Sequence, residues 1–351
     1  MNNIKFYALL ALAVLAFVGC AEDDIANTGV TPAQVGDEIV FGGKLDQEST
    51  RTVYGDKNDG YTEVKWVTGD GVGIYCAESY YIGADNHIVT DADGKKVTYR
   101  EYKVVGGIGS NVTDGVAQEK HSVALTTVDG GYGLRWGSDA KHTFYGVYPT
   151  KSHLMDKDQE AANALSLEGN TLKALLPNMQ GAQDASNNVY TKTSVTENVT
   201  GANNTSSART VDHFVYYPAM RNAYMVAKKE STPVSNLTLT FEPVVTAVEI
   251  TLQNLTTLTE NNTPAEQDLE VEMITISHPT AALCGAFSVD LNSNVVTNTN
   301  TGDEFKAVSV PTKVLATDNA SGNLLLNYGD KVTFTAFLAL DKNEPLDEIQ
   351  V

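Results

Sequence analysis

The segment KVTFTAFLAL, residues 331–340, carries the clearest structural signal in this chain of 351 residues. Apolar side chains occupy every second position, which is the period of a β-strand that places alternate side chains on opposite faces. We therefore expect a half-buried strand with one face on a hydrophobic core. The expected core face consists of Val332, Phe334, Ala336, Leu338 and Leu340.

The same two-residue period recurs in residues 37–45, 71–76, 235–242 and 247–252. Turn-forming sequences such as Asp93-Gly94 separate the periodic segments, and only Asp158–Leu167 reads as a short helix. Many short strands with little helix predict an all-β protein built from antiparallel β-sandwiches.

A chain of this length suggests about two domains. Residues 228–235 are polar and include Pro233, which is typical of a linker. We therefore expect one sandwich over residues 37–227 and a second over residues 236–351. Residues 184–209 are rich in Asn, Thr and Ser and are expected to form an exposed loop or an excursion from the fold.

The N-terminus has the features of a lipoprotein signal peptide. Phe6–Val18 is an unbroken apolar run of 13 residues, too short to span a bilayer but suited to the hydrophobic region of a signal peptide. It ends at Gly19-Cys20, where we expect cleavage of residues 1–19 and lipidation of Cys20. Ordinary signal cleavage nearby, with an incidental cysteine, is the alternative. Residues 20–36 would then form a flexible acidic leader.

Composition excludes several classes of function. The chain has 24 Lys and Arg against 44 Asp and Glu, a formal net charge of −20, which is unsuited to binding nucleic acid. None of the common hydrolase, metalloprotease or nucleotide-binding motifs occurs, and the six histidines are scattered. We expect no catalytic, metal-binding or cofactor-binding site and no enzymatic activity. Cys76 and Cys284 are far apart in apolar segments and are expected to be buried free thiols.

Four segments together resemble the fimbrillin family, the type V pilins and fimbrillin-like lipoproteins of Bacteroidales. Their order along the chain and their spacing carry the resemblance, with the lipobox before them. The segments are Ile39-Val40-Phe41 leading to Thr50-Arg51-Thr52, residues 66–75, Phe144–Pro149, and Phe241-Glu242-Pro243 followed by residues 274–276 and 283–287.

The resemblance implies two tandem transthyretin-like antiparallel β-sandwich domains. It also implies a structural or accessory subunit of an adhesive pilus, or fimbrium, exported as a surface-exposed lipoprotein of the outer membrane. In the family, an arginine-specific protease releases the first strand, and a strand from another pilus subunit replaces it. Here the cleaved bond would be Arg51–Thr52, and the displaced strand would carry Ile39, Phe41 and Leu45.

Two alternatives remain open at this stage. Arg51 is equally well explained as an ordinary exposed loop residue. The protein could instead act as a monomeric surface lipoprotein that binds a glycan or a host protein through loops of its second domain. Residues 347–351 end the chain inside an expected strand, where relatives usually continue, so we expect a truncated or unusually short second domain.

The signal-peptide interpretation gives a direct prediction. Labelled palmitate should be incorporated into the wild-type protein but not into Cys20→Ala, because the thiol of Cys20 is the expected attachment point. Wild type should also fractionate with the outer membrane, since more than one acyl chain gives stable anchoring. Lipid labelling of Cys20→Ala would place the modification elsewhere.

Overall fold

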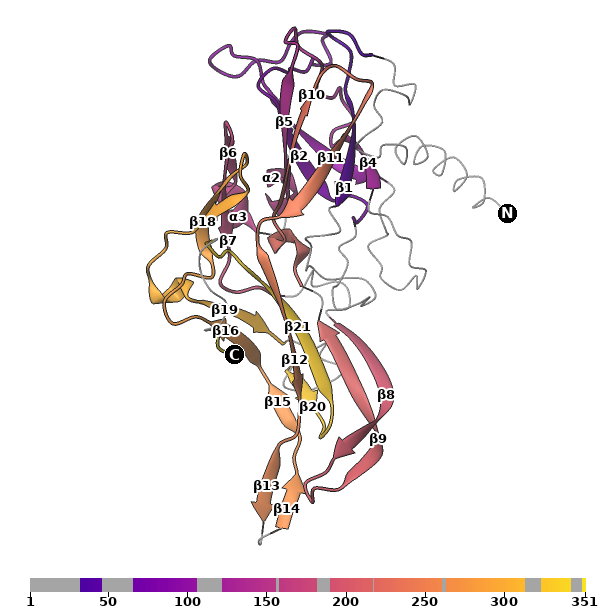
Figure 1. The fold of residues 1–351 in the computed structure, drawn as a ribbon, viewed down its shortest axis with the longest axis vertical. Helices are drawn as coiled ribbons and strands as arrows, with labels where there is room; N and C mark the ends of the chain where they lie inside the picture. Colours follow the sequence, from indigo (N-terminus) through magenta and orange to yellow (C-terminus); the bar gives the residue numbers. More distant parts are fainter. Residues whose placement is uncertain are drawn as a thin grey trace, which may run out of the picture. The chain divides into compact units, whose positions relative to one another are not determined.

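The structure is a computed structural model that describes residues 32–45, 66–105, 122–155, 158–181, 190–216, 218–260, 263–312, 323–341 and 349–351 (Figure 1). Strands dominate these residues, which confirms the predicted all-β class. Helical structure within them is limited to α2 (Lys151–Met155), α3 (Gln159–Ala164) and the short 3-10 turns η1 (Met220–Asn222) and η2 (Asp303–Phe305). The helix predicted at 158–167 is the shorter α3, because residues 166 and 167 already belong to a strand. Asp158 caps α3 by accepting a hydrogen bond from the Ala161 amide.

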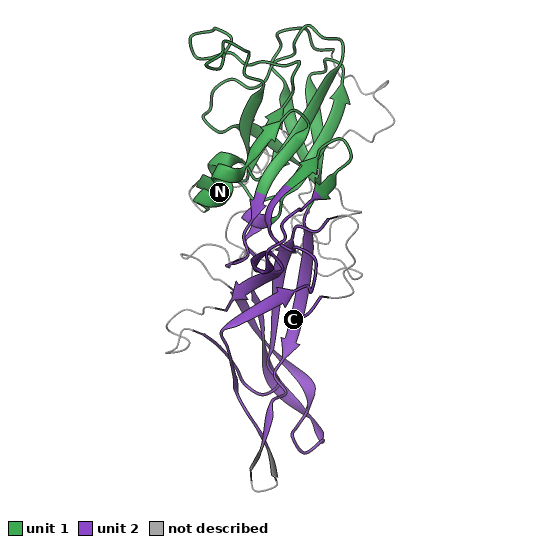
Figure 2. Ribbon diagram, turned by 90° about the vertical axis from the view of Figure 1, so that its left-hand side faces the viewer, with its two compact units in different colours: residues 1–174, 223–244, 288–296 green, residues 175–222, 245–287, 297–351 purple. Residues whose placement is uncertain are grey.

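The chain divides into two compact units (Figure 2). Unit 1 comprises residues 1–174, 223–244 and 288–296, and unit 2 comprises residues 175–222, 245–287 and 297–351. This division differs from the expected boundary, because residues 228–235 are no linker: β10 (Met225–Ser231) and β11 (Asn236–Pro243) both belong to unit 1. The polar residues of 228–231 include the outward face of β10, where Lys228 and Glu230 are exposed.

Unit 1 contains a closed barrel, in place of the separate stacked sheets that the sequence predicts. Besides β10 and β11, it contains β1 (Val40–Leu45), β2 (Gly71–Tyr75), β3 (Tyr99–Val105), β4 (Ser122–Thr127) and β5 (His142–Tyr148). The strands follow the order β1-β11-β10-β5-β2-β3-β4. Every neighbouring pair with a resolved register is antiparallel except β1 with β11, which run parallel. Closure leaves the sheet with no unpaired edge.

The core of the barrel is built from aromatic rings packed edge to face. Trp66 contacts Phe241 with ring centroids 5.4 Å apart, and Trp136 contacts Phe144 at 5.4 Å. Gly146 leaves room for this packing, since a Cβ at that position would lie 2.7 Å from the Phe241 ring. The apolar faces predicted for residues 71–76 and 235–242 are buried here. They consist of Val72, Ile74, Cys76, Leu237, Leu239 and Phe241.

Unit 2 is centred on a sheet of order β12-β21-β9-β8, from β12 (Thr246–Gln253), β21 (Lys331–Leu338), β9 (Ser206–Tyr216) and β8 (Tyr190–Thr200). The predicted core face of residues 331–340 is buried, with Val332 and Leu338 fully inaccessible. The opposite face was expected to be solvated, yet Thr335 and Phe337 are buried as well. The ladder between β21 and β9 covers only residues 331–333, and the buried Gln180 side chain bonds the amide and the carbonyl of Phe337 further along, at 2.8 and 2.7 Å.

In the described part of residues 184–209, the prediction of exposure is confirmed but an irregular loop is wrong, because β8 and β9 form an antiparallel hairpin. Threonine and valine favour extended backbone, and both faces of β8 remain largely exposed, which explains a strand without an apolar stripe. Shorter ladders complete the fold. They pair β13 (Thr257–Glu260) with β14 (Thr263–Glu266), β15 (Leu269–Val271) with β20 (Leu324–Leu326) and β16 (Met273–Ser277) with β19 (Ala307–Pro311). A further sheet has the order β18-β17-β7-β6, from β18 (Val295–Thr297), β17 (Gly285–Asp290), β7 (Thr171–Leu176) and β6 (Ser166–Glu168).

Both described cysteines are free and buried, as the sequence predicts. The Cys76 thiol donates to Glu78 Oε2 at 3.1 Å, and Cys284 packs in the core of unit 2. Burial raises the pKa of Cys76 to about 12 and that of Cys284 to about 11. The thiols therefore stay protonated in the folded chain at pH values where they ionise in the unfolded chain.

These thiols should make the protein lose stability at alkaline pH. Their stabilising contribution is complete below the unfolded pKa of 9.0 and is lost as the pH rises toward 11 to 12, by up to about 1.4 kcal/mol per pH unit for each thiol. The test compares urea unfolding of the chain after Cys20 with that of its Cys76→Ala/Cys284→Ala variant between pH 8 and 11. Tyrosine ionisation affects both proteins alike, so equal pH slopes would contradict the assigned role of the thiols.

Candidate functional site: the first strand of the barrel

Strand β1 is the segment on which the fimbrillin resemblance places its mechanism. It lies between β11 and β4 in the barrel of unit 1 (Figure 1). Its six residues pair in parallel with β11, from Val40 with Asn236 to Leu45 with Phe241, and residues 42–44 pair antiparallel with β4. Both neighbours come from distant parts of the sequence. The strand therefore closes the barrel without being joined to either neighbour by a short turn.

The inward face of this segment is fully buried. Ile39, Phe41 and Leu45 are 2%, 0% and 1% exposed, respectively. The Phe41 ring packs edge to face on Tyr102 at 5.3 Å and on Phe144 at 5.6 Å between centroids. Each of the three side chains contributes roughly 1.5–3 kcal/mol by leaving water. Between them lies the buried Gly43.

The outward face of β1 is different in character. Val40 is 46% exposed and Lys44 is also exposed. The strand thus presents alternate apolar and solvent-facing side chains, which is the pattern that an inserted strand needs to fill a row of pockets.

The chain just before β1 is tied to the barrel by a ladder of backbone hydrogen bonds. The Gly36 amide donates to the Trp136 carbonyl and the Ile39 amide to the Leu134 carbonyl, each at 2.9 Å, and Trp136 donates back to Asp37. Pro32 forms an isolated bridge with Val234. Residues 32–36, expected to belong to the flexible leader, are therefore ordered on the surface of unit 1.

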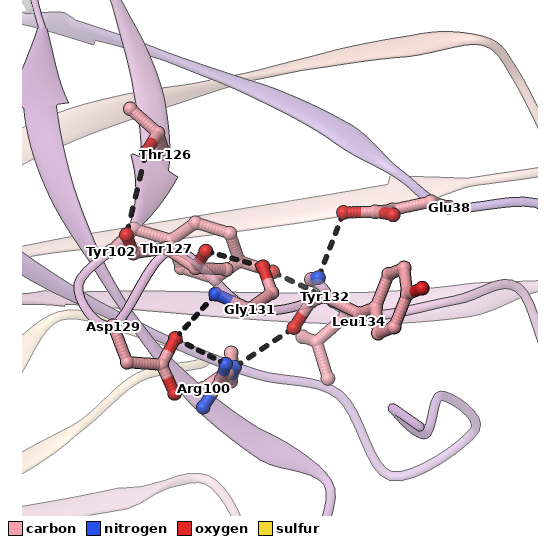
Figure 3. A network of polar contacts seen from close by, with 10 residues as sticks. Glu38, Arg100, Tyr102, Thr126, Thr127, Asp129, Gly131, Tyr132 and Leu134 are labelled. Atoms are coloured by element: carbon pink, nitrogen blue, oxygen red, sulfur yellow. Dashed lines mark hydrogen bonds and ion pairs between the residues drawn. The ribbon is translucent and has the colours of Figure 1, made fainter. Parts of the chain in front are cut away.

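Side chains reinforce this attachment around Glu38. Its Oε1 accepts a hydrogen bond from the Gly133 amide at 2.8 Å (Figure 3). Its Oε2 lies 3.8 Å from the Arg135 guanidinium. Arg135 also donates to the Gly36 carbonyl at 2.6 Å. The buried Tyr102 hydroxyl accepts a hydrogen bond from the Leu134 amide at 2.8 Å. The segment 133–136 therefore acts as a strap that holds the start of β1.

The other predicted site residues lie outside the described residues. These are Gly19 and Cys20 at the expected signal cleavage and Arg51 and Thr52 at the expected processing site. In the sequence, Arg51 follows Leu45 by six positions. A cut there would leave β1 connected only to the chain that precedes it.

The described residues offer little for catalysis or metal binding. Within them, no group of three His, Cys, Asp or Glu side chains is arranged to hold a metal ion. Cys76 lies beside Glu78, but its raised pKa keeps it a thiol, and a thiol is a poor nucleophile. In the parts of the chain that the structure covers, no helix has the length and apolar character needed to cross a membrane.

The sequence did not indicate which residues pair with β1 or hold its start. Residues 236–243 were assigned to the second domain, although their alternation correctly gave the buried face of β11. The strap at 133–136 carries no periodicity that would indicate its contacts. The Trp136 indole donates to the Val234 carbonyl at 3.1 Å. Pairing between strands so distant in sequence leaves no local pattern.

Comparison with known proteins gives distant similarities only. No protein-family model matches the chain, and no curated protein matches it significantly. A candidate cell adhesion protein of Bacteroides ovatus, known from a crystal structure, is 10% identical, with 89% of this chain and 81% of the other covered at a TM-score of 0.39. A second such protein, from Bacteroides uniformis, is 12% identical, with coverages of 86% and 74% and a TM-score of 0.33. At these TM-scores the similarity assigns neither fold nor function to the present chain.

Substitutions on the two faces of β1 should have very different effects on stability. Phe41→Ala should lower the free energy of unfolding of unit 1 by about 3–5 kcal/mol, because it leaves a cavity among Tyr102 and Phe144. Val40→Ala, on the exposed face, should change it by about 0.5 kcal/mol or less. Urea unfolding followed by tryptophan fluorescence reports on this unit, since both tryptophans, Trp66 and Trp136, lie in it. If the two substitutions lowered the free energy of unfolding equally, β1 would not be a core strand.

Proposed function

We propose that the protein is a structural or accessory subunit of an adhesive pilus that assembles by strand exchange through the β1 position. The observation that carries the proposal is the placement of β1 in the closed barrel. It is buried on one face, paired on both sides with sequence-distant strands, and followed by the basic residue Arg51. The proposal keeps from the fimbrillin resemblance two tandem transthyretin-like domains, although the seven-stranded sheet of unit 1 is closed into a barrel.

Removal of β1 would have two physical consequences. The backbone groups of β11 and β4 that now bond β1 would lose their partners, creating two facing strand edges. The positions of Ile39, Phe41 and Leu45 would become apolar pockets between those edges. An extended segment with apolar side chains at alternate positions would restore both the ladder and the core.

The proposal places the protein on the outside of the cell. Export as a lipoprotein through Cys20 would tether it to the outer membrane, and residues between the anchor and Pro32 would act as a spacer. Its partners would be other pilus subunits, which supply or receive the exchanged strand, and a host or bacterial surface receptor. No enzymatic activity is assigned to it.

The test uses an arginine-specific protease on the folded chain that begins after Cys20. Cleavage should occur first at Arg51 and should be followed by oligomers that withstand dilution, because a strand of one copy fills the groove of the next. Arg51→Ala should block both cleavage and assembly. Lys57→Ala, a charge-matched change in the same segment, should leave both unchanged.

Mass spectrometry identifies the cut, and light scattering coupled to size exclusion gives the oligomeric state. Two results would overturn the proposal: assembly of Arg51→Ala as efficient as that of wild type, or a cut protein that stays monomeric with its first strand bound. Either result would instead favour the monomeric surface lipoprotein that binds a glycan or a host protein.

A further inference from the structure

A cleft of about 700 Å³ lies on unit 1, beside the start of β1. This volume is within the ~300–1,000 Å³ typical of sites for small molecules. One side comes from the loop after β2 and another from the turn between β4 and β5. The lining side chains that matter here are Glu38, Tyr81, Ile82, Arg100, Asp129 and Tyr132.

Arg100 holds the turn that forms one wall of the cleft (Figure 3). Its Nε donates to the backbone carbonyl of Tyr132 at 3.0 Å, and its Nη2 donates to Asp129 Oδ1 at 2.6 Å. The Gly131 amide donates to the same Asp129 oxygen at 2.9 Å, and the Thr127 hydroxyl donates to the Gly131 carbonyl at 2.6 Å. The turn is therefore fixed before any ligand arrives, which lowers the entropic cost of binding.

Two tyrosines give the cleft flat apolar surfaces. The Arg100 guanidinium lies 4.5 Å from the centre of the Tyr81 ring, and the Arg135 guanidinium lies 5.4 Å from the centre of the Tyr132 ring. These cation–π contacts fix the orientation of both rings. Tyr132 is nevertheless 45% exposed, so its ring remains available for contact. Rings held in this way suit a ligand with flat C–H faces.

The charges of the cleft are already balanced. Arg100 is paired with Asp129, and Arg135 lies near Glu38. The Gly131 amide and the Arg100 guanidinium lower the pKa of Asp129, so its carboxylate is ionised at neutral pH. A phosphate or other anion would meet cations that already have carboxylate partners, which disfavours an anionic ligand.

Hydrogen-bond acceptors remain open to a neutral ligand. Asp129 uses Oδ1 for its hydrogen bonds to Arg100 and Gly131, and its side chain is 59% exposed, so the carboxylate is accessible to a ligand. A ligand rich in hydroxyl groups can donate to this carboxylate without adding charge.

We propose that this cleft binds a neutral pyranose sugar, with its C–H face on the ring of Tyr132 or Tyr81 and its hydroxyl groups on Asp129. Sugars combine in one small molecule the apolar faces and the many hydroxyl donors that these side chains match. The inference concerns the protein before strand exchange, because Glu38, which lines the cleft, precedes β1 and would leave with the first strand. An uncut pilus subunit and a monomeric surface protein would both carry the site.

The test uses saturation-transfer NMR on the full chain after Cys20. The probes are the methyl glycosides of glucose, galactose, mannose and fucose, and N-acetylglucosamine, each at millimolar concentration, with sialic acid as the anionic comparison. Titration calorimetry then gives the Kd of each sugar that responds. We expect at least one neutral sugar to bind, with its ring C–H protons receiving the strongest transfer.

Variants assign the binding to the cleft. Tyr132→Ala should weaken binding about tenfold, which corresponds to about 1.4 kcal/mol. It should leave the turn intact, because Arg100 bonds the backbone carbonyl of Tyr132 rather than its ring. Tyr132→Phe should keep the affinity. Tyr328→Ala is the matched control, because Tyr328 also stacks with an arginine, Arg209, at 5.5 Å, but in unit 2.

Three results would overturn the proposal: no transfer to any neutral sugar, transfer to sialic acid alone, or binding that Tyr132→Ala and Tyr328→Ala change equally. Failure of the sugar test would leave the protease experiment on Arg51 unaffected, and the reverse also holds. The two proposals therefore stand or fall separately.

Discussion

The parallel ladder between β1 and β11 is the constraint on which the rest of unit 1 depends. It joins the beginning of the fold to a strand far along the chain and, with the antiparallel ladder to β4, it closes the barrel. The side chains that enter the core from β1 complete the packing of Tyr102 and Phe144. Opening this ladder would expose backbone and apolar surface in the same place, so both forces favour a strand at that position.

The attachment of β1 has a particular topology. No short turn links the strand to its neighbours, and the strap at residues 133–136 holds only its beginning. A strand placed in this way is strongly held by non-covalent contacts yet can be disconnected by one cut on its C-terminal side. Loss of an internal strand such as β5 would instead require two cuts in the chain. This asymmetry makes strand exchange at the β1 position physically reasonable.

Local patterns in the sequence predicted local structure well. The alternation at Ile39, Phe41 and Leu45 gave the buried face of β1, and Asp158 marked the start of α3. The pairing of distant segments and the domain boundary could not be predicted in this way. The polar residues at 228–231 read as a linker because a strand with an exposed face and a linker have similar composition. Likewise, the Gln180 side chain bonds the backbone of Phe337, and no periodicity could indicate that contact.

Hydrogen exchange of the β11 and β4 amides tests the central claim most directly, namely that β1 is a separable strand whose position another strand can fill. The protein is cut after Arg51, the first strand is removed, and exchange is measured by mass spectrometry with and without a peptide of residues 37–46. We predict that amides in 236–241 and 122–124 lose protection on removal of the strand and regain it with the peptide, but not with its Phe41→Asp variant. Protection that survives removal of the strand, or that the native peptide does not restore, would contradict the account.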